Sequence, residues 1–173
     1  KHDSIETQLK LKYQEEIKGK SESEISEIYY QNLLSRSKNN RERLDHYFSA
    51  VQTFLETQKL IGPSQEAAQQ EIPDKTANYS QGFPALYKEV HDFIKNQYQD
   101  RLDEFFTKSA KIHFIVQNDH SLYIEKVEGT EKEFNDLALL AFLMTTGKWE
   151  SAFQRGMNVK SKFVLPVKFV VEE

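Results

Sequence analysis

The sequence predicts an α+β fold, with a helical N-terminal half followed by a domain that has a small antiparallel three-stranded sheet and two helices. Apolar residues recur at helical spacing through the first 60 residues, and β-type alternation begins only near residue 111. Between them, residues 62–82 are polar and hold two of the four prolines. We therefore expect a helical region at 1–61, a linker at 62–82 and a second domain at 83–173.

The N-terminal region is expected to form a helical hairpin or a three-helix segment. A first helix carries an apolar stripe and ends near Gly19. Ser21 and Glu24 have the spacing of a capping box that opens a second helix. Asn39 or Asn40 is expected to cap a third helix, which Gly62-Pro63 ends. Packing within the chain is the main interpretation, and a dimer seam along a long helix is the alternative. The stripe of the first helix consists of Ile5, Leu9, Tyr13 and Ile17.

The C-terminal region contains signals for two helices and three strands. Apolar residues after Gly82 predict a helix, and 131–146 is a second helical stretch rich in Leu and Ala. Residues 111–128 read as an antiparallel hairpin with turn residues at its centre. Trp149 is expected to be a core anchor whose indole N–H binds a carbonyl. The buried face of the first of these helices is predicted to hold Leu86, Val90, Phe93 and Ile94.

The last strand alternates strictly, which predicts one buried face and one wet face. The face predicted to be buried holds Val159, Ser161, Phe163, Leu165, Val167, Phe169 and Val171. The wet face holds Lys160, Lys162, Val164, Pro166, Lys168 and Val170. Lysines and a proline are also the residues that protect an edge strand from aggregation, so the pattern fits both a guarded edge and a recognition edge.

Composition and motifs argue against several classes of function. A net charge of −4 with interspersed signs disfavours a nucleic-acid groove. The chain has no cysteine, and we see no nucleophile elbow, phosphate loop or zinc spacing. His113 and His120 lie across the predicted hairpin, but they lack a third metal ligand. We therefore predict a protein that is not an enzyme, with no catalytic, cofactor-binding or metal-binding residues and no cofactor.

The ordered pieces of residues 82–171 resemble the C-terminal domain of TonB-type energy transducers, in the form common in the Bacteroidetes. The matching pieces are Phe83-Pro84 with Ala85-Leu86, the run Ile112, Phe114 and Val116, the turn Asn118-Asp119, Asn135-Asp136 with Ala138-Leu139, Lys148-Trp149, Gly156 with Val159, and Phe163-Val164-Leu165-Pro166-Val167-Lys168-Phe169. They span about half of the chain.

The resemblance implies a binding module in which both helices back one face of the sheet. Such a module takes up an extended peptide on its terminal strand, and in this family the peptide belongs to an outer-membrane receptor. The implied function is support of TonB-dependent transport in the periplasm. The implied partner-binding residues are Lys160, Lys162, Val164, Pro166, Lys168 and Val170. A homodimer through the same strand is the alternative partner.

Departures from the family pattern leave a second function open. Ala85-Leu86 stands where a double glycine is common, and Asp119-His120 stands where the hairpin turn commonly has Asp-Gly. No membrane helix or proline-rich spacer is present, and the chain begins at Lys1. We expect a removed signal, a membrane anchor or an expression boundary upstream of Lys1. The alternative function is a soluble envelope protein that reuses the domain for interaction or sensing, without energy transduction.

Overall fold

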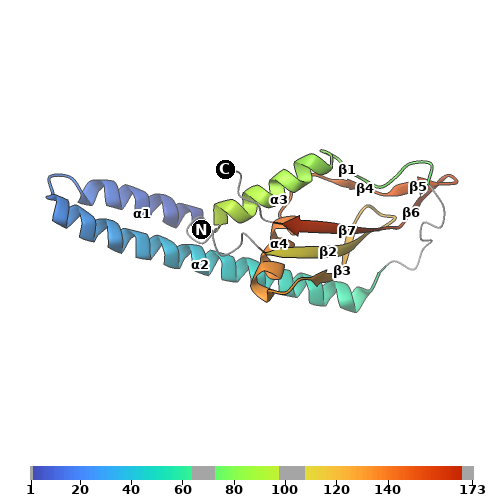
Figure 1. Cartoon of the computed structure of the whole chain (residues 1–173), viewed down its shortest axis with the longest axis horizontal. Helices are drawn as coiled ribbons and strands as arrows, with labels where there is room; N and C mark the ends of the chain where they lie inside the picture. The colour runs from blue at the N-terminus through green and yellow to red at the C-terminus, as the bar shows by residue number, and fades with distance from the viewer. Residues whose placement is uncertain (1, 64–72, 98–107, 169–173) are drawn as a thin grey trace. The chain divides into compact units, whose positions relative to one another are not determined.

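The computed structural model describes residues 2–63, 73–97 and 108–168 and has mixed helical and β structure with small antiparallel sheets (Figure 1). One compact unit ends at Ala50 and a second begins at Val51, so the division lies inside a helix and not in the 62–82 stretch. The elements are α1 (His2–Glu16), α2 (Glu22–Ile61), β1 (Asn78–Tyr79), α3 (Phe83–Gln97), β2 (Ser109–Val116), β3 (Leu122–Glu128), α4 (Lys132–Leu143), β4 (Trp149–Glu150), β5 (Ala152–Gln154), β6 (Met157–Val159) and β7 (Ser161–Lys168).

The first unit is a hairpin of α1 and the first part of α2, so the helical hairpin is confirmed and the three-helix alternative is wrong. The capping box forms as expected, since the Ser21 amide donates to Glu24 Oε2 at 2.9 Å and the Glu24 amide to Ser21 Oγ at 3.4 Å. The Ser21 amide and then the Ser21 hydroxyl, which both donate to Glu24 Oε2, hold the pKa of Glu24 below its ordinary value. Asn39, which we expected at a helix start, lies inside α2 because its side chain bonds to His2 instead of to its own backbone.

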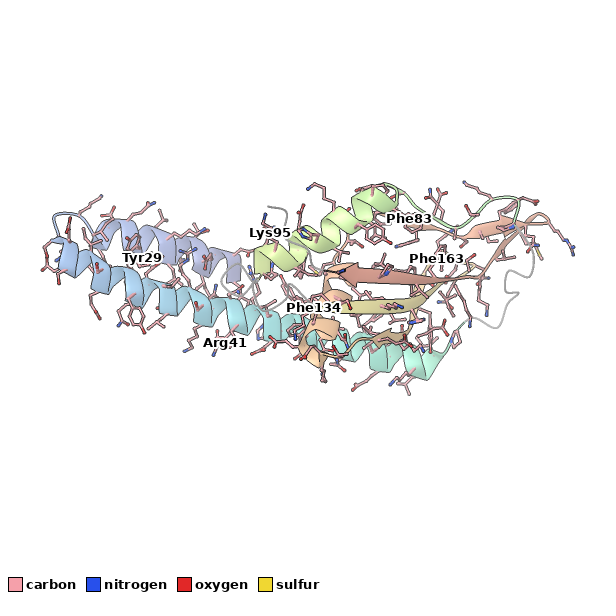
Figure 2. The ribbon with its side chains drawn as sticks, in the orientation of Figure 1. Tyr29, Arg41, Phe83, Lys95, Phe134 and Phe163 are labelled. Atoms are coloured by element: carbon pink, nitrogen blue, oxygen red, sulfur yellow. The ribbon has the colours of Figure 1, made fainter. Side chains whose placement is uncertain are left out.

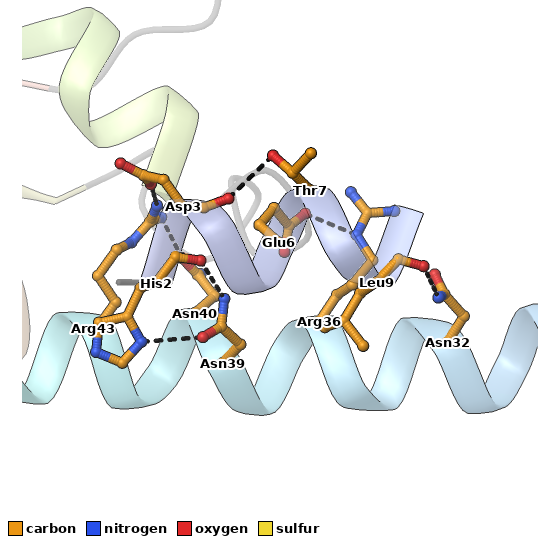
Figure 3. A network of polar contacts seen from close by, with 10 residues as sticks. All are labelled: His2, Asp3, Glu6, Thr7, Leu9, Asn32, Arg36, Asn39, Asn40 and Arg43. Atoms are coloured by element: carbon orange, nitrogen blue, oxygen red, sulfur yellow. Dashed lines mark hydrogen bonds and ion pairs between the residues drawn. The ribbon is translucent and has the colours of Figure 1, made fainter. Parts of the chain in front are cut away.

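Polar contacts hold the two helices of this hairpin together (Figure 3). The Arg36 Nε lies 2.7 Å from Glu6 Oε1, and the side-chain Nδ2 of Asn32 donates to the Leu9 carbonyl at 2.7 Å. Asn39 is buried, with Nδ2 donating to the His2 carbonyl at 3.1 Å. No described residue of α1 is buried, and the predicted apolar stripe stays half-exposed. Register between these helices therefore depends on side-chain hydrogen bonds more than on apolar burial.

The second unit contains a three-stranded antiparallel sheet in the order β3-β2-β7, with the strands side by side as Figure 1 shows. The predicted hairpin is confirmed as β2 and β3, with a bulge in β3 beside His113 and Phe114. β7 runs antiparallel to β2 over the full length of both strands, from Ser109 opposite Lys168 to Val116 opposite Ser161. The last described strand, β7, therefore lies beside the central strand, β2.

Aromatic rings from both helices fill one face of this sheet. Phe114 of β2 stacks on Phe163 of β7 with ring centres 5.6 Å apart. Phe142 of α4 lies 4.8 Å from Phe114, and Phe83 of α3 lies 6.1 Å from Phe163. Rings in these offset and tilted arrangements add to the burial of apolar area. The core on this face therefore depends on α3, α4 and the sheet together.

The sequence did not predict the short strands β1, β4, β5 and β6. Tyr79, inside the stretch predicted as a linker, is fully buried and pairs with Trp149 in the β1–β4 ladder. The Tyr79 hydroxyl donates to Glu89 Oε1 at 2.9 Å and accepts the Gly147 amide at 2.7 Å. A Cβ on Gly147 would lie 2.3 Å from the Tyr79 ring, so only glycine fits there. Burial raises the pKa of Tyr79.

Trp149 is a core residue as predicted, but its hydrogen bond was predicted wrongly. Its side chain is buried and contacts the rings of Phe114 and Phe142. Among the described residues, the indole Nε1 is buried without a hydrogen-bond partner. The recorded contacts of the indole are with aromatic rings, which Tyr79 and Phe83 also supply.

Residues 117–121 connect β2 and β3, and His120 among them adopts a positive φ of 71°. The Gln117 amide donates to the Ser121 carbonyl at 2.8 Å and closes the loop. Buried Ser151 fixes His120, since its amide donates to His120 Nδ1 at 2.9 Å. The side chain and amide of Ser121 hold the pKa of Asp119 below its ordinary value. These bonds stabilise a connection that has no glycine, whereas a tight two-residue turn would favour one.

Candidate functional site

The candidate site is the side of β7 that faces away from β2. Within residues 2–63, 73–97 and 108–168, β2 is the only strand that pairs with β7. β7 is therefore an edge strand of the described sheet. The function expected from the resemblance depends on this position. An edge strand presents a row of backbone donors and acceptors to which another strand can add.

One hydrogen bond at the β2–β3 turn shows which backbone groups point outward. In an antiparallel strand, the N–H and C=O of one residue point to the same side, and the next residue points to the other. Gln117 directs its amide to Ser121, toward β3. Odd-numbered residues of β2 therefore face β3, and even-numbered ones such as Ile112 face β7. Their partners in β7 are the odd-numbered residues, of which Leu165 is one.

The even-numbered residues of β7 consequently turn their backbone groups outward. Pro166 supports this assignment independently, since it has no N–H and would break the ladder if it faced β2. We call the set Lys162, Val164, Pro166 and Lys168 the outer edge. The outward donors are the amides of Lys162, Val164 and Lys168, and all four residues direct carbonyls outward.

The side chains of the outer edge are exposed, whereas their neighbours in β7 are buried or half-buried. Val164 is 50% exposed, and Leu165 beside it is 2% exposed. This alternation confirms the predicted faces over the described part of the strand. Lys160 precedes β7, is half-buried and already has an interaction partner, so it does not belong to the outer edge. Val170 lies outside the described residues.

Positive charge predominates along the outer edge. Lys162 Nζ lies 3.6 Å from Glu125 Oε2, with the lysine side chain 74% exposed. Lys111 stands opposite Pro166 and is also exposed. In the described part of the chain, no ion pair involves Lys111 or Lys168. A ligand on this edge would therefore meet Lys168, which has no ion pair within the described ranges, and Lys111, whose cross-strand neighbour in β3 is Glu128.

The opposite edge of the sheet, β3, is partly closed by the second half of α2. Gln58 Nε2 donates to the Ile124 carbonyl at 2.5 Å, and Gln58 Oε1 accepts the Ile124 amide at 3.1 Å. One side chain thus occupies both outward groups of Ile124, as a pairing strand would. Sequence reasoning missed this contact, because nothing about a lone glutamine late in a helix marks it as the partner of a distant strand.

The described residues hold few groups arranged for other chemistry. His113 Nε2 lies 3.2 Å from Glu128 Oε2, whereas His120 bonds to Ser151, so the two histidines have separate partners. Lys126 and then His113 hold the pKa of Glu128 below its ordinary value. A search of the described part found no group of three or more acidic, His or Cys side chains suited to a metal ion. None of the described helices is both long and apolar enough to span a bilayer.

Comparisons of the chain with protein-family models, with curated proteins and with solved structures found no match.

Proposed function

We propose that the chain is a TonB-like binding module of the cell envelope, which pairs the outer edge of β7 with an extended segment of an outer-membrane receptor. The observation that carries this proposal is the direction of the Val164 backbone, which points away from β2 on a strand with one described neighbour. Main-chain hydrogen bonds to the outer edge would supply affinity, and side chains at alternate positions would supply selectivity. Support of TonB-dependent transport in the periplasm follows from the same proposal.

The arrangement of the sheet core agrees with a rigid platform for such pairing. Phe163 and Leu165 are packed from the inner side, so β7 is ordered before any peptide arrives. An ordered strand loses little conformational entropy on binding, and the cost falls mainly on the peptide. The helical backing by α3 and α4 supports the family proposal, because the resemblance implies two helices behind the sheet.

The test is capture of receptor-derived peptides by a matched pair of variants, Val164→Pro and Val164→Thr. Proline removes the outward amide at the centre of the edge without removing a hydrogen bond to β2. Threonine keeps the amide and nearly the same shape. We expect Val164→Pro to abolish capture of segments from receptor plug domains, while Val164→Thr binds like the parent chain. Equal capture by both variants, with circular dichroism showing intact folds, would contradict the proposal.

A second candidate function is an envelope interaction or sensing protein that uses the same edge without transducing energy. The helical hairpin favours it, because ordered helices occupy residues 2–61, where a transducer has a proline-rich spacer. The two functions separate in cells that lack their own transducer and express this protein from its complete gene. Restored receptor-dependent uptake identifies a transducer, and peptide capture without uptake identifies a static platform.

A further inference from the structure

We infer that the outer edge selects an acidic, alternating peptide over a second copy of its own strand. This inference rests on the proposed function and specifies the partner's chemistry. Lys162 and Lys168 stand at the two ends of the edge, on the exposed face of the sheet. A strand added to this edge would place side chains directly beside both lysines. Acidic residues at those two positions would therefore be favoured.

The described residues neutralise the charge at this edge only in part. Glu125 reaches Lys162 only at 3.6 Å, between side chains that are 34% and 74% exposed. Within the described ranges, Lys168 and neighbouring Lys111 take part in no ion pair. An incoming carboxylate would thus gain attraction without displacing a strong internal bond.

The other face of an added strand would meet apolar surface. Phe83 and Phe163 are both half-buried, with ring centres 6.1 Å apart, and they come from α3 and β7 (Figure 2). Residues opposite Phe163 and Leu165 would point to this face, because side chains on neighbouring strands share a face when they stand opposite one another. The preferred ligand therefore has apolar residues alternating with polar ones, and acidic residues at its ends.

Pairing of β7 with its own copy is disfavoured by the same residues. An antiparallel pair centred on Val164 puts Lys160 opposite Lys168, and one centred on Leu165 puts Lys162 opposite Lys168. A pair centred on Phe163 avoids these contacts, but it leaves Lys168 beyond the overlap of the two edges. In every register Pro166 lacks a donor. The lysines thus disfavour the two registers of self-pairing that are centred on Val164 and Leu165.

The experiment uses three labelled heptapeptides with glycine-serine tails, Asp-Val-Thr-Val-Thr-Val-Asp and its Asn-ended and Lys-ended counterparts. Their sequences are palindromic, so the charges meet both lysines in either strand direction. We expect fluorescence anisotropy to give roughly tenfold tighter binding for the acidic peptide than for the Asn-ended one, and weaker binding still for the Lys-ended one. High salt should reduce the difference.

A double variant, Lys162→Glu with Lys168→Glu, should reverse the preference, because it replaces both cations and leaves the inner face unchanged. Equal binding of the three peptides, still lost in Val164→Pro, would overturn the charge inference and leave strand addition intact. Binding that is insensitive to Val164→Pro, or absent for every peptide, would overturn the proposed function as well. A dimer in sedimentation that Val164→Pro dissolves would overturn the inference in favour of self-pairing.

Discussion

The two edges of the same three-stranded sheet are treated differently by the rest of the chain. On β3, Gln58 from α2 bonds to both outward groups of Ile124, and a bulge interrupts the strand. On β7, Val164 keeps its outward amide and carbonyl with no strand beside them among the described residues. Edges are usually covered, bulged or charged to prevent unwanted pairing. On the proposed function this difference has a reason, since β7 would be left open for a partner while Gln58 occupies the outward groups of Ile124 on β3.

The largest expected effect is the difference in unfolding free energy between proline substitutions at Leu165 and at Val164, two neighbouring residues of β7. Leu165→Pro removes an amide that faces β2 and empties a buried side-chain position, so we expect a loss of at least about 3 kcal/mol in the free energy of unfolding. Val164→Pro removes an outward amide and should cost about 1 kcal/mol or less. Urea denaturation followed by tryptophan fluorescence measures both, since Trp149 lies in the core. Similar losses for the two variants would show that our assignment of the strand sides is wrong.

Gln58→Ala should have a smaller effect and would make the two edges more alike. It removes two partly buried hydrogen bonds to Ile124, for a loss of about 1–2 kcal/mol. Exchange of the Ile124 amide with solvent should also accelerate. Exposed Gln52, on the same helix, provides the control, and Gln52→Ala should stay within about 0.5 kcal/mol of the parent chain. An Ile124 amide that stays equally protected in Gln58→Ala would remove the contrast between the edges.

The smallest effect concerns the charges along β3. Lys126 and His113 lower the pKa of Glu128, so its ionised form is favoured in the folded chain. A lowered carboxylate pKa adds stability above the ordinary value of 4.5, and this stability is lost as the pH falls through the folded pKa. Glu128→Gln should therefore flatten the acid side of the stability profile slightly and leave the alkaline side unchanged. An acid limb of unchanged slope would contradict the predicted ion pair.

Sequence patterns predicted the parts of the fold in which a pattern repeats over many residues. The alternation from Ser161 to Lys168 fixed the buried and exposed faces of β7, and the turn residues near Asn118 marked the hairpin. The capping box at Ser21 was visible for the same reason, because it is a local contact. Alternation alone does not tell which strand lies at the edge; that expectation came from the lysines and the proline of the last strand and from the resemblance.

Contacts between distant residues could not be predicted. Strands as short as Asn78–Tyr79 have no period, so Tyr79 was assigned to a linker although it is fully buried. Asn39 has the residue type of a helix cap, but it lies inside α2, where its side chain bonds to His2 across the hairpin. No sequence pattern marks Gln58 either, yet its side chain bonds to both outward backbone groups of Ile124 on β3.

Residue-resolved amide exchange of β7, with and without the acidic heptapeptide, tests the central claim most directly. In the free chain we predict fast exchange at Val164 and slow exchange at Phe163 and Leu165, because only the outward amide lacks a partner strand. Addition of the peptide should slow exchange at Val164 and leave its two neighbours unchanged. Slow exchange at Val164 in the free chain, or no change on peptide binding, would contradict an edge kept open for strand addition.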